Sequence, residues 1–173
     1  HGIGCPAFTT KCTNDDLGFE IRSYPATAWA AYNSSTPNGG FEHLFNYISG
    51  TNVQGKKIDM TAPVLQSTAY GAHPFIANAT HFFIPPSVLP APTPTEGVYL
   101  VTLPAIDVAV KVYGGYSNEA EVTKNLSELR TALQTTGAKY DDSWNAQCGY
   151  DAPFTVFNRH NEVWLAVDAS TAC

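Results

Sequence analysis

The chain has 173 residues, of which 44% are hydrophobic and 14% charged, and its formal net charge is −6. This length predicts one domain with a substantial core, and the composition excludes a disordered polyelectrolyte and a coiled coil. The longest run of basic residues is the pair Lys56–Lys57, so nothing attracts a nucleic acid, and no apolar stretch is long enough to predict a membrane span.

The first half of the chain predicts strands around one short helix. Residues 18–32 alternate apolar and polar side chains and are interrupted by Pro25, which is typical of two strands or of one broken strand. Residues 40–50 place apolar side chains on one helical arc and end at a glycine, which predicts an amphipathic helix. Strand-like runs follow at 57–70 and 79–84.

The second half repeats this layout after a connecting segment, residues 84–97, that is too rich in proline for regular structure. The pattern predicts a helix over 117–137, with Asn118 as its N-cap and Gly137 as its stop. The expected strands are a pair at 98–104 and 108–116, and two more at 153–158 and 161–168.

Two halves of similar layout predict a pseudo-symmetric α+β domain. We expect its antiparallel strands to form a curved sheet or distorted β-barrel flanked by two α-helices. Residues 1–17 would be an N-terminal extension held by disulfides, and residues 18–173 a single domain.

Six segments between about residues 18 and 168 carry a resemblance to a known family. In chain order they are FEIRSY, GFEHLFNYISGTN, KKIDMTAPV, YGGYSNEA, GYDAPF and NRHNEVWL. Their order and spacing resemble those of the SOUL haem-binding protein family. The resemblance implies the fold of bacterial effector-binding domains of the gyrase-inhibitor type, and non-covalent binding of haem or another tetrapyrrole.

The resemblance also places a ligand cleft beside the first predicted helix. A tetrapyrrole is an apolar disc with two carboxylates, so its site needs an apolar slot and cations at the mouth. An alternative is that the apolar arc of this helix (Phe41, Leu44, Phe45 and Ile48) is simple core. The residues predicted to bind the ligand are Phe41, Phe45, Lys56, Lys57, Met60, Arg159 and Trp164.

The axial ligand for iron is less clear. Some relatives have a histidine between the Arg and Tyr of the first segment, but this chain has Ser23 there. The candidate is His43, because it lies on the predicted helix, although on the side opposite to the apolar arc. The other histidines are His1, His73, His81 and His160.

Cysteines and sequons indicate a secreted protein. The chain starts at His1 rather than Met, as a mature chain would after signal removal. The four cysteines, Cys5, Cys12, Cys148 and Cys173, lack metal-site spacing and predict two disulfides, with three pairings open. Bridges from the N-terminal segment to the C-terminal half would close the longest loops. The glycosylation sequons are Asn33, Asn78 and Asn125.

Three other functions remain open from the sequence. No catalytic motif of the common hydrolases or nucleotide-binding enzymes is present, but Glu162 or Glu42 could act as a general base in a hydrolase-like cleft. His1 could bind copper through its amine and imidazole. Finally, the domain could serve as a secreted interaction protein without a pigment. We expect a small apolar ligand as the main partner; the sequence does not predict the oligomeric state.

Overall fold

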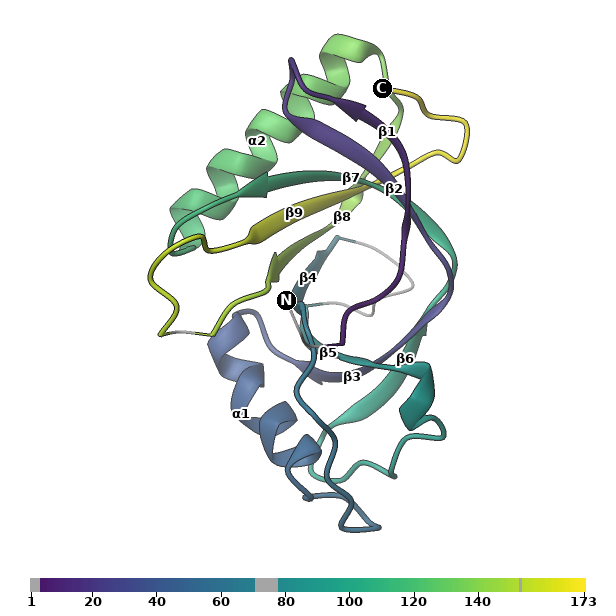
Figure 1. The fold of residues 1–173 in the computed structure, drawn as a ribbon, viewed down its shortest axis with the longest axis vertical. Helices are drawn as coiled ribbons and strands as arrows, with labels where there is room; N and C mark the ends of the chain where they lie inside the picture. The colour runs from purple at the N-terminus through teal and green to yellow at the C-terminus, as the bar shows by residue number, and fades with distance from the viewer. Residues whose placement is uncertain (1–3, 71–77, 153) are drawn as a thin grey trace.

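The structure, a computed structural model, describes residues 4–70, 78–152 and 154–173. It has nine strands and two α-helices (Figure 1). The strands are β1 (Thr9–Asn14), β2 (Phe19–Tyr24), β3 (Thr27–Asn33), β4 (Val64–Ala69), β5 (Ala79–Ile84), β6 (Tyr99–Leu103), β7 (Ile106–Tyr113), β8 (Tyr140–Gly149) and β9 (Asn161–Val167). The helices are α1 (Pro37–Ile48) and α2 (Glu119–Thr136), with a 3-10 turn at Pro86–Val88. Neither α-helix is long and apolar enough to span a membrane.

All nine strands belong to one antiparallel sheet with the order β1-β2-β7-β9-β8-β4-β5-β3-β6. The expectation of an α+β fold with a curved antiparallel sheet and two flanking helices is therefore confirmed. β2 and β3 follow each other across Pro25, and β6 and β7 follow each other across Pro104. Because β2 pairs with β7 while β3 pairs with β6, the two bent segments run together as one long ribbon.

Several strand predictions were wrong. Residues 98–104 and 108–116 are not a pair with each other, since each pairs with a different part of residues 19–33. Of the expected strand at 57–70, residues 57–63 lie outside the strands, although Ile58 and Ala62 are buried. The expected strand at 153–158 is a connection between β8 and β9, and β1 and β8 were not predicted.

Both predicted helices are present. α2 has the N-cap and the glycine stop that the sequence predicted, whereas α1 begins at Pro37, three residues before the predicted segment 40–50. Thr36 caps α1 by accepting a hydrogen bond from the Gly39 backbone N–H, and Asn118 caps α2 by accepting one from the Glu121 N–H. Gly137 ends α2 with φ of 73°, in the left-handed region that favours glycine.

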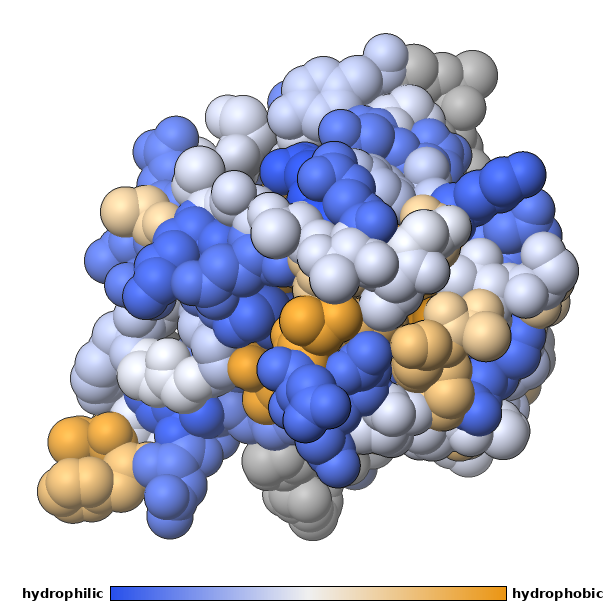
Figure 2. Space-filling view, turned by 90° about the horizontal axis from the view of Figure 1, so that it is seen from above, coloured by the Kyte–Doolittle hydropathy of each residue, from blue (hydrophilic) through white to orange (hydrophobic). Residues whose placement is uncertain are grey.

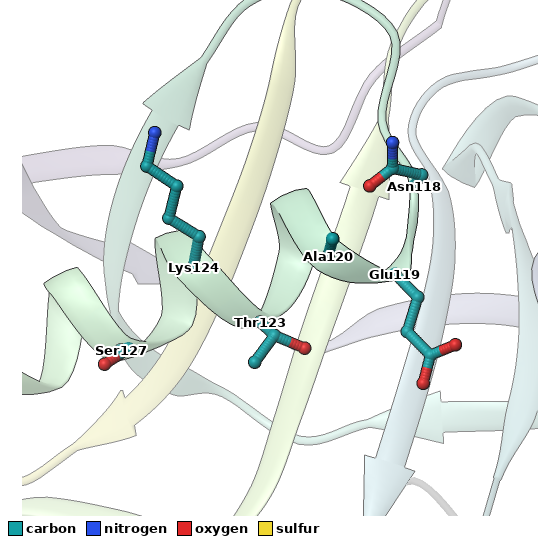
Figure 3. A pocket seen from close by; sticks show the side chains of 6 residues that line it. All are labelled: Asn118, Glu119, Ala120, Thr123, Lys124 and Ser127. Carbon is teal, nitrogen blue, oxygen red and sulfur yellow. The ribbon is translucent and has the colours of Figure 1, made fainter.

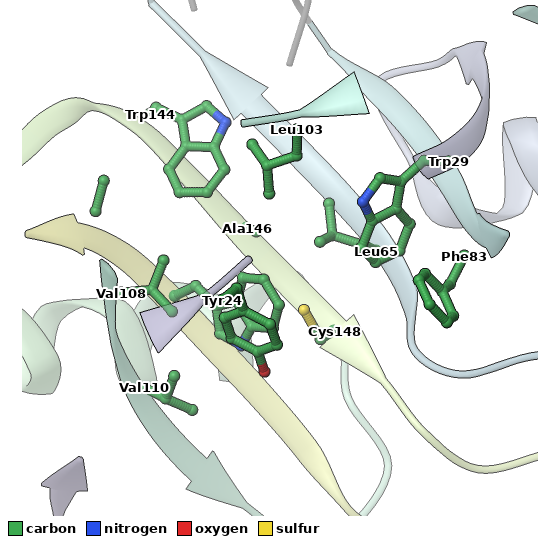
Figure 4. Close-up of a cluster of buried hydrophobic side chains, with 12 residues drawn as sticks. Tyr24, Trp29, Leu65, Phe83, Leu103, Val108, Val110, Trp144, Ala146 and Cys148 are labelled. Atoms are coloured by element: carbon green, nitrogen blue, oxygen red, sulfur yellow. The ribbon is translucent and has the colours of Figure 1, made fainter. Parts of the chain in front are cut away.

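The core has three clusters. Two lie on the face of the sheet that carries the helices, one under α1 and one under α2, and the third lies on the opposite face. Leu126, Leu129 and Leu133 pack α2 on β2, β7 and β9, whereas Leu44, Tyr47 and Ile48 pack α1 on β3 and β5. The third cluster contains no helix residue and holds all three tryptophans. Figure 4 shows these side chains converging between the strands. The sheet is therefore buried on both faces.

Candidate functional site

An exposed aromatic pair lies on one flank of α1. Phe41 and Phe45 are 38% and 47% exposed, and their rings are nearly parallel, with an interplanar angle of 12° and centroids 5.9 Å apart. The edge of Phe41 also contacts the buried ring of Phe82, whose centroid is 5.2 Å away. The pair thus presents flat apolar surface to solvent while one of its members is fixed to the core.

The interpretation of these two phenylalanines as simple core was wrong, because the buried side of α1 is Gly40, Leu44, Tyr47 and Ile48. At 100° per residue, Phe41 and Phe45 lie at the margin of this buried arc. Gly40 is required where the helix meets β5, because a Cβ there would lie 2.4 Å from the Thr80 hydroxyl oxygen. Because α1 packs closely on β5 at Gly40, the exposed rings lie on the flank of the helix rather than at the centre of its buried side.

The other predicted ligand-binding residues are dispersed. Lys56 and Lys57 are exposed just beyond the C-terminal end of α1, and Met60 is half-buried against the cluster under that helix. Arg159 donates hydrogen bonds to backbone carbonyls of its own connection, and Trp164 is buried in the cluster away from both helices. The structure therefore groups the lysines and Met60 around α1, but not Arg159 or Trp164.

The histidines are placed away from the aromatic pair. His43 lies on the opposite flank of α1, where its ring stacks on Tyr32 at 3.9 Å between centroids. His81 is fully buried in β5, and the His160 Nε2 lies 2.6 Å from a Glu162 oxygen. His1 and His73 lie outside the described residues. Thus no histidine in the described part of the chain faces Phe41 and Phe45, and an iron ligand from His43 would need a disc on the other flank.

Glu162 is the centre of a buried polar network that the sequence did not reveal. Its carboxylate forms an ion pair with Arg22, whose Nη1 and Nη2 lie 2.9 and 3.0 Å from the two oxygens. It also accepts hydrogen bonds from the Tyr150 hydroxyl at 3.0 Å and the Trp164 indole N–H at 2.8 Å. With the His160 ring nitrogen, five groups contact this carboxylate: two nitrogens of Arg22, the Tyr150 hydroxyl, the Trp164 indole N–H and His160 Nε2. This arrangement saturates both oxygens.

The charges within this network stabilise each other. Burial alone would raise the pKa of Glu162, but hydrogen bonds from His160 and Arg22, together with the Arg22 charge, hold that pKa below its usual value. Burial would likewise lower the pKa of Arg22, yet the contacts with Glu162 raise it. Glu162 is therefore a bound anion rather than a surface carboxylate. It has no free oxygen with which to act as the general base of a hydrolase.

The cysteine and sequon predictions have mixed outcomes. Cys12 and Cys173 form a disulfide across 161 positions, which joins the N-terminal segment to the C-terminal end as expected. Cys148 is a buried thiol and Cys5 an exposed one, so the predicted second disulfide is absent from this structure. Asn125 is buried, and its amide is bonded to the Lys111 ammonium and the Glu121 carbonyl. The buried Asn125 amide leaves no room for a glycan in this structure, whereas Asn33 and Asn78 are exposed.

Two surface hollows lie elsewhere. One follows the outward side of α2 and is lined by small or polar side chains of that single helix and its cap (Figure 3). The other, of about 320 Å³, lies between β3, β6 and the proline-rich connection, where Leu89, Pro90 and Leu100 contribute to an apolar lining. Neither hollow is lined by Phe41 or Phe45. The aromatic pair is therefore separate from both of these hollows.

The comparisons with known proteins agree with this fold and with the six sequence segments. The SOUL heme-binding protein model matches residues 3–166. Heme-binding protein 2 of Homo sapiens is 31% identical over 157 residues, which cover 85% of this chain and 77% of that protein. Heme-binding protein 1 of Mus musculus is 32% identical over 127 residues, or 70% and 66% of the two chains.

Solved structures of low sequence identity share the architecture. The EcmrR C-terminal domain has a TM-score of 0.61 at 10% identity and covers 87% of this chain and 96% of its own. An uncharacterized conserved protein from Listeria innocua has a TM-score of 0.60 at 13% identity, with 88% and 93% covered. At such identities the likeness shows the fold alone. The match over residues 3–166 and the identity to heme-binding protein 2 show that the chain belongs to the SOUL heme-binding protein family.

Proposed function

We propose that this protein binds haem or a related tetrapyrrole non-covalently, and that it serves as an extracellular carrier or scavenger. The observation that carries the proposal is the exposed pair Phe41–Phe45, whose rings are nearly parallel, in a chain of a haem-binding family. Aromatic rings stack with other flat apolar rings in offset or tilted arrangements, and each such contact adds about 0.5–1.5 kcal/mol beyond area burial. A macrocycle that covers both rings would remove a solvent-exposed apolar surface from water.

The groups around α1 fit a tetrapyrrole in part. Lys56 and Lys57 are exposed cations near the C-terminal end of the helix, and they would neutralise propionates that extend past Phe45. Met60 adds apolar surface on the same side of the sheet. When bound, haem would supply a redox-active iron, but the described residues of the Phe41–Phe45 flank offer it no histidine. Recognition would therefore depend on shape, apolar burial and carboxylate contacts.

An absorbance titration tests this function. The protein should shift the Soret band of haemin saturably at one equivalent, and protoporphyrin without iron and biliverdin should also bind, because the described site recognises the disc rather than the metal. The variant F45D should bind at least about tenfold more weakly, since it places a charge under the disc. The matched control is L100D, because Leu100 is 43% exposed on β6, outside this flank.

Both variants should unfold cooperatively like the parent chain, because both positions are exposed. No saturable change with any of the three pigments would refute the proposal. Binding that requires iron would contradict recognition by shape and direct the search to an axial ligand. Equal affinities of F45D and the parent would show that the pigment lies elsewhere.

Secretion and glycosylation remain part of this proposal. The Cys12–Cys173 disulfide supports it, because disulfides persist mainly in oxidising compartments. Expression through a secretory pathway should give glycans at Asn33 and Asn78, whose side chains are exposed, and none on folded protein at Asn125. Mass spectrometry of peptides after deglycosylation in heavy-oxygen water would record the occupancy. A native, fully folded product with a glycan at Asn125 would contradict this reasoning.

A further inference from the structure

The connection between β8 and β9 exposes three large apolar side chains within four positions. Phe154 is 84% exposed, Val156 61% and Phe157 82%. Isolated exposed apolar residues are normal in soluble proteins, but a contiguous group marks an interaction site. The connection lies at the periphery of the molecule in Figure 1. We propose that Phe154, Val156 and Phe157 form a tip that inserts into the interfacial layer of a phospholipid membrane.

Hydrogen bonds and ring contacts hold the backbone of this tip in place. Arg159 Nη1 donates to the carbonyl oxygens of Ala152, at 2.8 Å, and Thr155, at 2.7 Å. The guanidinium also lies over the Tyr116 ring, 4.2 Å from its centroid. The Thr155 N–H donates to the Ala152 carbonyl and closes a turn. The fold therefore holds the two phenylalanines in water, although collapse onto the surface would bury them.

The chemistry of the tip favours lipid over a protein partner. The side chains of Phe154, Val156 and Phe157 have no hydrogen-bonding group, so they offer burial without the polar contacts that orient a protein interface. Residues 154–159 contain no acidic side chain and end in Arg159, whereas the whole chain has a net charge of −6. Tyr116 and Arg159 at the base form an aromatic and cationic collar, which is typical of residues at the membrane–water interface.

The view in Figure 2 shows no large continuous apolar face. Figure 2 shows that hydrophilic side chains predominate on the face seen from above, and that apolar side chains form separate small groups there. Contact through a tip alone predicts reversible binding driven by apolar burial rather than by charge. The inference does not depend on pigment binding, because it rests on a different segment from Phe41 and Phe45.

Vesicle sedimentation with the full chain tests the proposal. The probe is phosphatidylcholine vesicles, which carry no net charge. The protein should bind them, and binding should persist in about 1 M NaCl, where the Debye length is only about 3 Å. A phenylalanine ring that leaves water by about half contributes about tenfold to partitioning, so F154S/F157S should bind about a hundredfold more weakly. V53S, which changes a 66% exposed valine after α1, is the matched control and should bind like the parent.

The same variants titrated with haemin separate this inference from the proposed function. Unchanged haemin affinity of F154S/F157S together with lost vesicle binding would support the membrane tip. The proposal is overturned if the parent protein ignores the vesicles, or if the double variant binds them like the parent. It is also overturned if the double variant keeps vesicle binding and loses haemin, because the tip would then belong to the pigment site.

Discussion

A buried histidine should make the protein sensitive to acid. His81 is fully buried in β5, where its Nδ1 lies 3.3 Å from the Leu65 carbonyl oxygen and its ring packs edge-on against Trp29. Burial lowers the pKa of His81 from the usual 6.5 to about 4, even though hydrogen bonds with the Leu65 and Ala79 backbone act in the opposite direction. The folded protein therefore keeps this ring neutral.

The sign and size of the effect follow from proton linkage. Between pH 6.5 and pH 4 the unfolded chain binds a proton at His81 that the folded chain does not, so the free energy of unfolding falls as the pH falls. At about 1.4 kcal/mol per pH unit, the total loss from this residue is about 3 kcal/mol, and about 2 kcal/mol of it occurs above pH 5. The contribution is fully present above pH 6.5.

Urea unfolding followed by tryptophan fluorescence at several pH values from 7 to 5 tests this calculation. H81N keeps a hydrogen-bonding side chain but cannot titrate, so it should lose about 2 kcal/mol less than the parent over this range, whatever its stability at pH 7. The control is F83L, a core substitution two positions away without a titratable group, which should lower the curve in parallel. Identical pH slopes for H81N and the parent would refute the idea that His81 is held neutral.

Three further predictions concern the buried network, acid stability and the disulfide. E162Q removes the more buried of the two carboxylates that pair with Arg22 and leaves the ion pair with Glu20, so it should cost about 3 kcal/mol in urea unfolding, at the low end of the range for a broken buried pair. E128Q, which breaks the exposed pair with Lys111, should cost less than about 1 kcal/mol. Similar losses for the two variants would contradict the network. The pKa of Glu162 is lowered from 4.5, so its contribution to the free energy of unfolding is present above pH 4.5 and is lost as the pH falls below it. In E162Q the free energy of unfolding should therefore depend less on pH than in the parent below pH 4.5, and equally above it. A weaker pH dependence of E162Q above pH 4.5 would contradict this assignment. C12S/C173S removes the disulfide that closes a loop of 161 positions, and by loop entropy it should lower the free energy of unfolding by about 5 kcal/mol. Dithiothreitol should lower the urea midpoint of the parent but not that of the variant.

Local signals in the sequence were sufficient for the helices and for several strands. The cap Asn118, the leucine stripe and Gly137 all act within a few positions of one another, and they specify α2 without information from the rest of the chain. Pro25 likewise marks the break between β2 and β3. Strand β8 was missed because its sequence, YDDSWNAQCG, has polar residues at positions that become buried only when β4 and β9 pair on either side.

The Glu162 network was missed for a related reason. Alternation in FEIRSY and NEVWL correctly separated Ile21 and Val163 from Arg22 and Glu162, but a single alternating strand does not say that its polar face is also covered. The ion pair joins residues 140 positions apart, and its existence depends on the order β2-β7-β9 in the sheet. No periodicity within one segment carries that information.

The saturation of this network bears on where function is located. Glu162 accepts hydrogen bonds from Arg22, Tyr150 and Trp164, and a ligand that displaced Arg22 would leave the buried carboxylate without its ion pair. The polar interior therefore holds the strands in register. Exposed apolar groups, by contrast, gain from being covered by a partner, and among the described residues these include Phe41 and Phe45 on α1, and Phe154 and Phe157 after β8. Phe41 packs on the buried Phe82, and Arg159 holds the backbone of the connection that carries Phe154 and Phe157, so a partner would meet segments that are already positioned.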